Sequence, residues 1–286
     1  MNGYQYIIEK QSAWAKNKGL QLIGSQINRG RPMYTAKLED NLFKPLTADV
    51  MHCFRGGDGN ELGSNGNPGK MQAVHSSSAL GVNVFQYWKS ISAVPVIAAA
   101  CGLCSQDSDV SDDIRFEDKY PISRSFKFSP NIDVVIYNRP EAKYKRFAIE
   151  CKFSEAYSAQ KHDGLKKKYL ELSVWDDVPA LRQCAEMMSP ADKDFTYLHP
   201  AQLIKHILGL KIHYGVNGFR LLYLWYDVLG EQGKGHRDEI ERFNEIAKKD
   251  GIKFQSLTYQ DLISRLANQY RSEHKAYIQY LTERYL

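Results

Sequence analysis

The sequence of 286 residues has no long apolar run and no export signal. Its longest apolar stretch, residues 93–103, is far shorter than the roughly 20 residues that a membrane-spanning helix needs. Residues 1–11 lack the basic and then apolar pattern of a signal peptide. We therefore expect a cytoplasmic protein without membrane contact. A hydrophobic content of 43% is ordinary for a globular chain with a sizeable core.

Cysteine is scarce and scattered. The five cysteines are an odd number without the spacing of a disulfide framework. Cys101 and Cys104 form a CxxC pair with no second pair near it, which favours packed thiols over a zinc or redox site. Cysteine chemistry is therefore not expected to carry the function.

The sequence also lacks the loops that bind nucleotides or calcium. In the glycine-rich stretch 56–70, Ser64 stands where a phosphate loop needs its first glycine, and Met71 follows the lysine. Leu62 and Gly69 stand where a calcium loop needs ligands. Phosphate-loop nucleotidases and calcium-binding hands are therefore excluded.

What the chain does contain is charge inside two apolar segments that read as buried strands. Asp133 interrupts the run 132–136, and Glu150 and Lys152 interrupt the run 147–153. A buried charge costs several kcal/mol, on the order of 5, unless it is paired or binds a metal. Strand alternation places Glu150 and Lys152 on one face. Pairing the segments as a hairpin brings Asp133 close to Glu150.

Two carboxylates and an amine in one patch suit metal-dependent phosphodiester chemistry. Oxygen ligands are preferred by Mg²⁺, which keeps several of its waters. The ion polarises a phosphodiester and lowers the pKa of an attacking water. A lysine two residues after a ligand projects to the same side and can orient that water. The alternative is an accidental salt-bridged pair, since the Glu-x-Lys pattern alone occurs in many solvated strands.

These residues resemble the PD-(D/E)XK nuclease superfamily, in which an acid on the second core strand precedes Glu/Asp-x-Lys on the third. Asp133 corresponds to the acid, and Glu150-Cys151-Lys152 to the tripeptide, although Pro130 lies three residues before Asp133. The resemblance covers residues 125–227. It implies a three-layer restriction-endonuclease-like core. It also implies that Asp133, Glu150 and the Cys151 carbonyl bind Mg²⁺, with Mn²⁺ able to replace it, and that Lys152 acts on the water.

The same resemblance extends to two further residues. The segment 54–80 is similar to the glycine-rich loop and serine-capped helix that supply an upstream glutamate in some relatives, which implies that Glu61 is a ligand. A solvated loop acid is the alternative for Glu61. Gln202 stands where exonuclease-like members carry a glutamine, but His206 replaces their aromatic partner. We therefore expect Gln202 to lie on the exposed side of a core helix. The alternative is that Gln202 contacts a residue of the metal site without binding the metal itself.

Basic residues concentrate around this motif. Residues 139–168 contain nine Lys or Arg and four Asp or Glu, a net charge of +5 that equals the excess of the whole chain. Such a field attracts a polyphosphate backbone, although lysine runs are often only solvated helix faces. Near the expected site, the candidate DNA contacts are Lys143, Lys145, Arg146, Lys166, Lys167 and Lys168, with Lys161 in the same window. Tyr157, Tyr169 and Trp175 are candidates for base stacking or for core packing.

The coarse pattern predicts one α/β domain over residues 1–286, with a mixed central sheet flanked by helices. Residues 1–45 form a helical N-terminal extension, and the catalytic core spans about 46–260. Helices are expected at 4–17, 47–57, 75–88, 179–188, 199–214, 235–250 and 258–284. Strands are expected around Asp133 and Glu150, at 220–227 and 252–257, and at 126–128. Residues 105–118 are expected to be a polar loop or sheet edge.

The function expected from these features is a Mg²⁺-dependent DNA endonuclease of a restriction, defence or repair type. The first alternative is a non-catalytic nucleic-acid-binding module on the same fold, although such a relative would usually lose one of the three motif residues. The second is an unrelated α/β enzyme. DNA is the expected partner, RNA stays an alternative, and a homodimer is left open.

Overall fold

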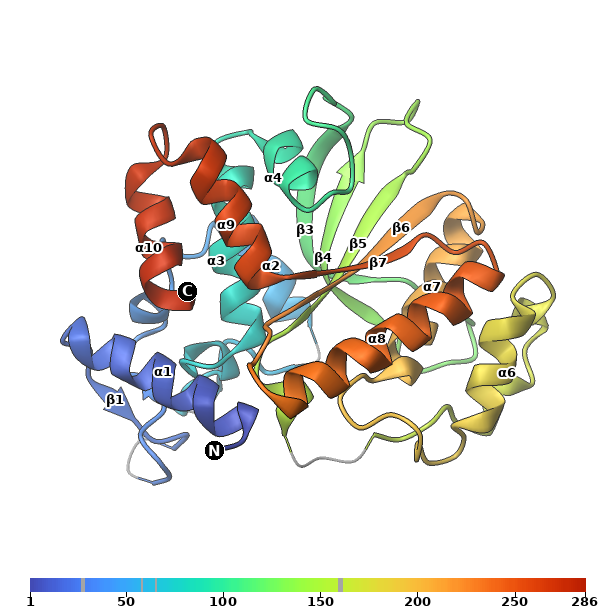
Figure 1. Cartoon of the computed structure of the whole chain (residues 1–286), viewed down its shortest axis with the longest axis horizontal. Helices are drawn as coiled ribbons and strands as arrows, with labels where there is room; N and C mark the ends of the chain where they lie inside the picture. Colours follow the sequence, from blue (N-terminus) through green and yellow to red (C-terminus); the bar gives the residue numbers. More distant parts are fainter. Residues whose placement is uncertain (27–28, 58, 65, 159–161) are drawn as a thin grey trace.

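A five-stranded mixed sheet forms the centre of the molecule (Figure 1). The computed structural model describes residues 1–26, 29–57, 59–64, 66–158 and 162–286. The strand order is β3-β4-β5-β6-β7; β3, β4 and β5 pair antiparallel, whereas β5, β6 and β7 pair parallel. The strands are β3 Ser111–Lys119, β4 Asn131–Asn138, β5 Arg146–Lys152, β6 Phe219–Trp225 and β7 Phe254–Thr258.

Helices cover both faces of the sheet, as Figure 1 shows. One face packs against α1 Gly3–Asn17, α2 Ala48–Gly56, α3 Ser77–Ser90, α4 Val94–Ala100, α9 Tyr259–Tyr270 and α10 Lys275–Tyr285. The other face packs against α6 Pro179–Met187, α7 Pro200–Tyr214 and α8 Glu231–Lys249. The expected three-layer α/β architecture is confirmed.

Strand β5 has the alternation that a sheet between two helical layers requires. Phe147, Ile149 and Cys151 belong to the core beneath α3, whereas Ala148 belongs to the core beneath α7. The alternation places Glu150 and Lys152 on the α7 side, away from those three apolar residues, as the sequence predicted.

Short elements connect this framework. They are β1 Leu22–Ile23, β2 Tyr34–Thr35, α5 Lys167–Leu170 and the 3₁₀ turns Leu38–Asn41, Lys70–Gln72, Glu155–Tyr157 and Ser173–Trp175. Helix α3 starts as its serine-rich sequence predicts, because the Ser76 hydroxyl accepts a hydrogen bond from the Ala79 amide. No helix among the described residues is long and apolar enough to cross a bilayer.

The strand expected at 126–128 is wrong. The strand before β4 is β3, drawn largely from the acidic stretch expected to be a loop or edge. Ile114 and Phe116 alternate into the core and supply the burial that the acidic residues do not. Residues 123–126 instead form a turn, in which the Phe126 amide donates to the Ser123 carbonyl at 3.1 Å.

The single helix expected at 258–284 is also wrong, because it breaks at residues 271–274 into α9 and α10. An unbroken helix of that length would reach about 40 Å at 1.5 Å per residue, more than one core layer can cover. The break lets Leu266 and Leu281 pack into the same core. It is fixed by His274, whose Nδ1 lies 2.9 Å from the Tyr87 hydroxyl.

A buried arginine near the C-terminus joins α10 to the N-terminal segment. Arg284 is only 1% exposed. Its guanidinium donates to Gln11 Oε1 at 3.0 Å and to the carbonyl and Oδ1 of Asn41 at 2.8 and 2.5 Å. Residues 1–45 are therefore fastened to the core layer formed by α10.

Arg284→Ala should lower the free energy of unfolding by about 3 kcal/mol, because it leaves several buried acceptors without a donor. Urea unfolding followed by circular dichroism measures the change. The matched control is Arg271→Ala at an exposed position, with an expected effect within about 0.5 kcal/mol. Equal effects of the two substitutions would contradict a fastening role for Arg284.

Candidate active site

The candidate site lies at the edge of the sheet where β3 and β5 end and β4 begins. The register that pairs Val134 with Ile149 brings Asp133 opposite Glu150 on the adjacent strand. Opposite residues of antiparallel strands share a face, with Cβ atoms about 5 Å apart. The sequence-based hairpin, with both acids on neighbouring strands, is therefore what the structure contains.

Glu150 is completely buried and held by two basic side chains. The Lys152 Nζ lies 2.6 Å from its Oε1, and the His206 Nε2 from α7 lies 2.8 Å from its Oε2. Burial opposes ionisation of Glu150, but the charge of Lys152 and the contact with His206 outweigh it and lower its pKa to about 2. Glu150 is therefore an anion at neutral pH, and its orientation is fixed from two sides.

Lys152 lies between this carboxylate and a helix. Burial disfavours its charge, but the nearby carboxylates of Glu150 and Asp133 raise its pKa, so the amine is a cation. Its Nζ also donates to Gln202 Oε1 at 3.0 Å. The expectation that Gln202 lies on the exposed side of α7 is therefore wrong, and the glutamine positions the lysine.

For Asp133, the groups that oppose ionisation outweigh those that favour it. Its Oδ2 accepts a hydrogen bond from the Cys151 amide at 2.7 Å, which ties it to β5. Burial and then the charge of Glu150 raise its pKa well above the usual value for aspartate. Two neighbouring buried carboxylates thus repel each other, and a bound cation would relieve that repulsion.

The sequence analysis missed a third strand acid, Glu117. The register of β3 with β4 brings Glu117 opposite Asp133, so three carboxylates lie in a row across β3, β4 and β5. The backbone of Glu117 has φ +52°, which is strained for a residue with a side chain. Burial and then the charge of Glu61 raise its pKa to about 7, and Asn131 Nδ2 donates to its Oε2 at 3.2 Å. The signal was the alternation of Ile114 and Phe116 within a stretch that the sequence analysis expects to be a loop or sheet edge, and β3 is the edge strand.

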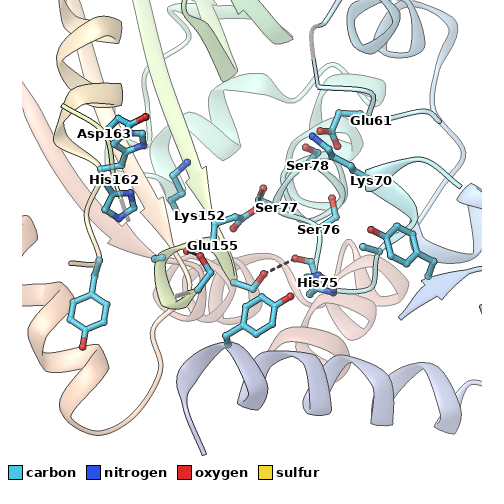
Figure 2. A pocket seen from close by; sticks show the side chains of 18 residues that line it. Glu61, Lys70, His75, Ser76, Ser77, Ser78, Lys152, Glu155, His162 and Asp163 are labelled. Atoms are coloured by element: carbon cyan, nitrogen blue, oxygen red, sulfur yellow. Dashed lines mark hydrogen bonds between the residues drawn. The ribbon is translucent and has the colours of Figure 1, made fainter. Parts of the chain in front are cut away.

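Glu61 approaches the row from the loop before α3. Burial raises its pKa, while a hydrogen bond from the Ser78 hydroxyl and the charge of Lys70 oppose that shift. Figure 2 places Glu61 beside Lys70 and Ser78, with Lys152 on the sheet facing them. The charge of Glu61 is, after burial, the second cause of the raised pKa of Glu117.

A cavity of about 560 Å³ lies between the loop that carries Glu61 and the end of the strand that carries Lys152. Glu61 and Lys152 both contribute to its wall. In Figure 2, Lys152 lies between Glu61 on one side and His162 and Asp163 on the other. Asp133, Glu150 and Glu117 are not among the residues that line the cavity, so it reaches the site at Lys152 and Glu61.

The basic window does not lie around the site as a whole. Lys143 and Lys145 belong to the hairpin turn, and Arg146 begins β5, so this group lies about 20 Å from Lys152 at 3.3 Å per residue. The Lys145 amine is used locally, donating to the Ala142 carbonyl at 2.8 Å. The expectation that this part of the window surrounds the site is wrong.

The second part of the basic window is nearer the site. Lys166 acts electrostatically on Lys205 of α7, which is itself within reach of Glu150. Lys167 pairs with Glu171 at 3.4 Å, and the Lys168 amine lies over the Phe126 ring. Lys161 lies outside the described residues. Two of the proposed stacking residues, Tyr157 and Trp175, are buried in the core, and Tyr169 is partly buried against it.

The residues suit a divalent metal by the chemistry of their donors. Among the described residues, no group of three or more His, Cys, Asp or Glu side chains is gathered as a ready ion cage. Glu150 faces Lys152 and His206 instead. The mutual repulsion of Asp133, Glu117 and Glu150 is nevertheless what a hard cation with oxygen ligands offsets. Of these, Asp133 and Glu150 are the candidate ligands.

This fold and site define a restriction-endonuclease-like protein: a mixed sheet between two helical layers, with the acid and Glu-x-Lys residues on adjacent strands. Residues 8–286 match the family described as Restriction Endonuclease associating with ARP, and the chain belongs to that family. No curated protein and no solved structure matches the chain.

Glu117→Gln should stabilise the protein at pH 8 and change little at pH 5. The pKa of Glu117 is about 7 in the fold against 4.5 for an ordinary glutamate, so its burial cost appears as pH rises from 4.5 through 7. The full cost is on the order of 1–3 kcal/mol, which removal of the charge recovers. Melting temperatures at the two pH values measure it.

The matched control is Glu241→Gln, at an exposed position of α8. It should have no pH-dependent effect on the melting temperature. If Glu117→Gln is equally neutral at pH 8, Glu117 does not face the other acids.

Proposed function

We propose that the protein is a divalent-metal-dependent DNA endonuclease that hydrolyses phosphodiester bonds. The observation that carries the proposal is the pairing of Asp133 with Glu150 on adjacent strands, with Lys152 projecting from the same face into a cavity. The membership of the chain in a restriction-endonuclease family supports it.

Asp133, Glu150 and the Cys151 carbonyl would hold Mg²⁺ or Mn²⁺, and Glu61 would add a ligand or hold a metal-bound water. When bound, the ion polarises the phosphodiester and lowers the pKa of the attacking water. Glu150 would offer the ion one oxygen, because His206 contacts the other at 2.8 Å. Asp133 is kept in position by the Cys151 amide.

Lys152 has two roles in this proposal. Without metal it neutralises Glu150 at 2.6 Å. With a metal bound at Glu150, its cationic amine would turn toward the cavity, where it could orient the attacking water or a phosphoryl oxygen. Gln202 limits this movement, because it accepts one hydrogen bond from the amine at 3.0 Å.

DNA is the proposed substrate, and RNA is the alternative. The family description names an association with ARP, so we propose that the chain works with a partner protein. Activity in restriction, defence or repair, in the cytoplasm, is consistent with this proposal.

A non-catalytic nucleic-acid-binding module is the second candidate function. The observation in its favour is that both oxygens of Glu150 already have partners, Lys152 and His206. A carboxylate paired in this way is neutralised by its neighbours without a metal. Activity measurements separate the two functions.

Lys152→Ala and Asp133→Asn should each reduce nicking of supercoiled plasmid in Mg²⁺ by at least about 100-fold, because each removes a group that stabilises charge in the transition state. Asp133→Asn should also weaken the rise in melting temperature that Mg²⁺ causes. In metal-free buffer it should melt at or above the wild-type temperature, since it relieves repulsion with Glu150.

Lys143→Ala, at the far end of the hairpin, is the control for the loss of a lysine and should leave the chemical step unchanged. An inactive wild type on every DNA and RNA form, in Mg²⁺ and Mn²⁺, would favour the binding module. Cleavage by both variants at the wild-type rate would assign the activity to another site.

A further inference from the structure

The cavity beside the acids has a ring-lined part that the proposed metal chemistry does not use. Aromatic and imidazole rings reach it from segments far apart in the sequence. They belong to Tyr4, Tyr34, His75, His162, Tyr197 and His199. The first two come from α1 and β2, and the last two come from the segment that leads into α7.

These rings form pairs rather than a scattered set. His162 and His199 stack with centroids 4.7 Å apart and planes 21° apart. Tyr4 meets His75 edge to face at 5.8 Å. The two pairs come from different parts of the chain and line the same cavity.

Two imidazoles at this cavity, those of His199 and His75, have lowered pKa values and favour the uncharged state. Burial and the neighbouring His162 lower the pKa of His199 to about 4, and burial lowers the pKa of His75. Neutral rings suit stacking on a flat base better than they suit contact with a phosphate.

Polar groups line the other part of the same cavity. The hydroxyls of Ser76, Ser77 and Ser78 lie there at the start of α3 beside Lys70, and Lys152 reaches the cavity from the end of β5 (Figure 2). Of the nearby carboxylates, Glu155 is already engaged, since it accepts hydrogen bonds from Ser77 Oγ at 2.5 Å and from the Phe153 amide at 3.0 Å. The cavity thus has a ring-lined region that suits a base and a polar region rich in hydroxyls, in which Lys70 and Lys152 lie together with the carboxylates of Glu61, Glu155 and Asp163.

We propose that this cavity receives an unpaired nucleotide of the strand that is cut, so that the enzyme acts on single-stranded or frayed DNA. This inference rests on the proposed function and specifies its substrate. A volume of about 560 Å³ lies within the range of about 300–1,000 Å³ of pockets that enclose one small ligand. In an intact duplex, stacking covers the faces of each base and pairing covers its Watson–Crick edge. A cavity that encloses one base therefore selects a base that has left the stack.

Tyr197 is the residue on which the proposal is best tested. Its ring lines the cavity, and a matched Phe variant keeps the ring while removing the hydroxyl. The probes are a fluorescein-labelled single-stranded oligonucleotide, the blunt duplex of the same sequence and free thymidine monophosphate. Affinities are measured by anisotropy in Ca²⁺, which takes oxygen ligands without the tight octahedral geometry of Mg²⁺.

The wild type should bind the single strand at least about 10-fold more tightly than the blunt duplex or the mononucleotide. Tyr197→Ala should weaken single-strand binding by about 5- to 150-fold, the range for loss of one stacked base, while Tyr197→Phe stays within about 2-fold of wild type. Phe128→Ala, an exposed aromatic position at 61%, is the control and should have no effect.

Because the Tyr197 ring also packs near His236 and Tyr157, Tyr4→Ala provides a second variant from another element. Melting temperatures show which variants are folded. Equal affinity for duplex and single strand, with no loss in the folded variants, overturns the proposal. Mononucleotide binding as tight as oligonucleotide binding also overturns it, by assigning the cavity to a small nucleotide.

The outcome is separable from that of the proposed function. If the protein cleaves plasmid but binds duplex more tightly, with no effect of the ring variants, the nuclease function stands and the single-strand inference is wrong. If the ring variants weaken single-strand binding but no substrate is cleaved, the assignment of the cavity stands and the proposed catalytic function is wrong.

Discussion

The whole site depends on keeping the charge of Glu150 in the interior of the protein. A carboxylate with no exposed surface is stable there only because Lys152 and His206 each hold one of its oxygens. One partner comes from β5 itself and the other from α7. The charge therefore ties α7 to β5 through His206, and Gln202 of the same helix contacts the lysine.

The neighbouring acids make this edge of the sheet energetically unfavourable without a cation. Asp133 and Glu117 both have raised pKa values from burial and mutual repulsion, and Glu117 also holds a strained backbone. Strain and repulsion of this kind persist only where the surrounding core is stable enough to tolerate them. The two apolar layers on either side of the sheet provide that stability.

Much of this arrangement could be predicted from sequence, because the features that carry it are local. The charges at Asp133, Glu150 and Lys152 interrupt apolar runs, and strand alternation then fixes their faces. The role of Glu117 could not be predicted, because β3 is an edge strand rich in acids. The burial of β3 comes from Ile114 and Phe116 and from pairing with β4. The contacts of His206 and Gln202 depend on how α7 lies on the sheet, which helical periodicity alone does not determine. The basic turn was misplaced for a related reason, since closeness in sequence to Glu150 hid the length of the strand between them.

The buried guanidinium of Arg284 has a consequence for the timing of biosynthesis. It holds Asn41 and Gln11, and the same N-terminal region carries Tyr4 and Tyr34 into the wall of the cavity. During translation, strands β3 to β6 leave the ribosome well before residue 284 does. A nascent chain can therefore assemble the strand acids while the cavity wall is still unfastened. The contacts that fasten this wall therefore form only after residue 284 has been made.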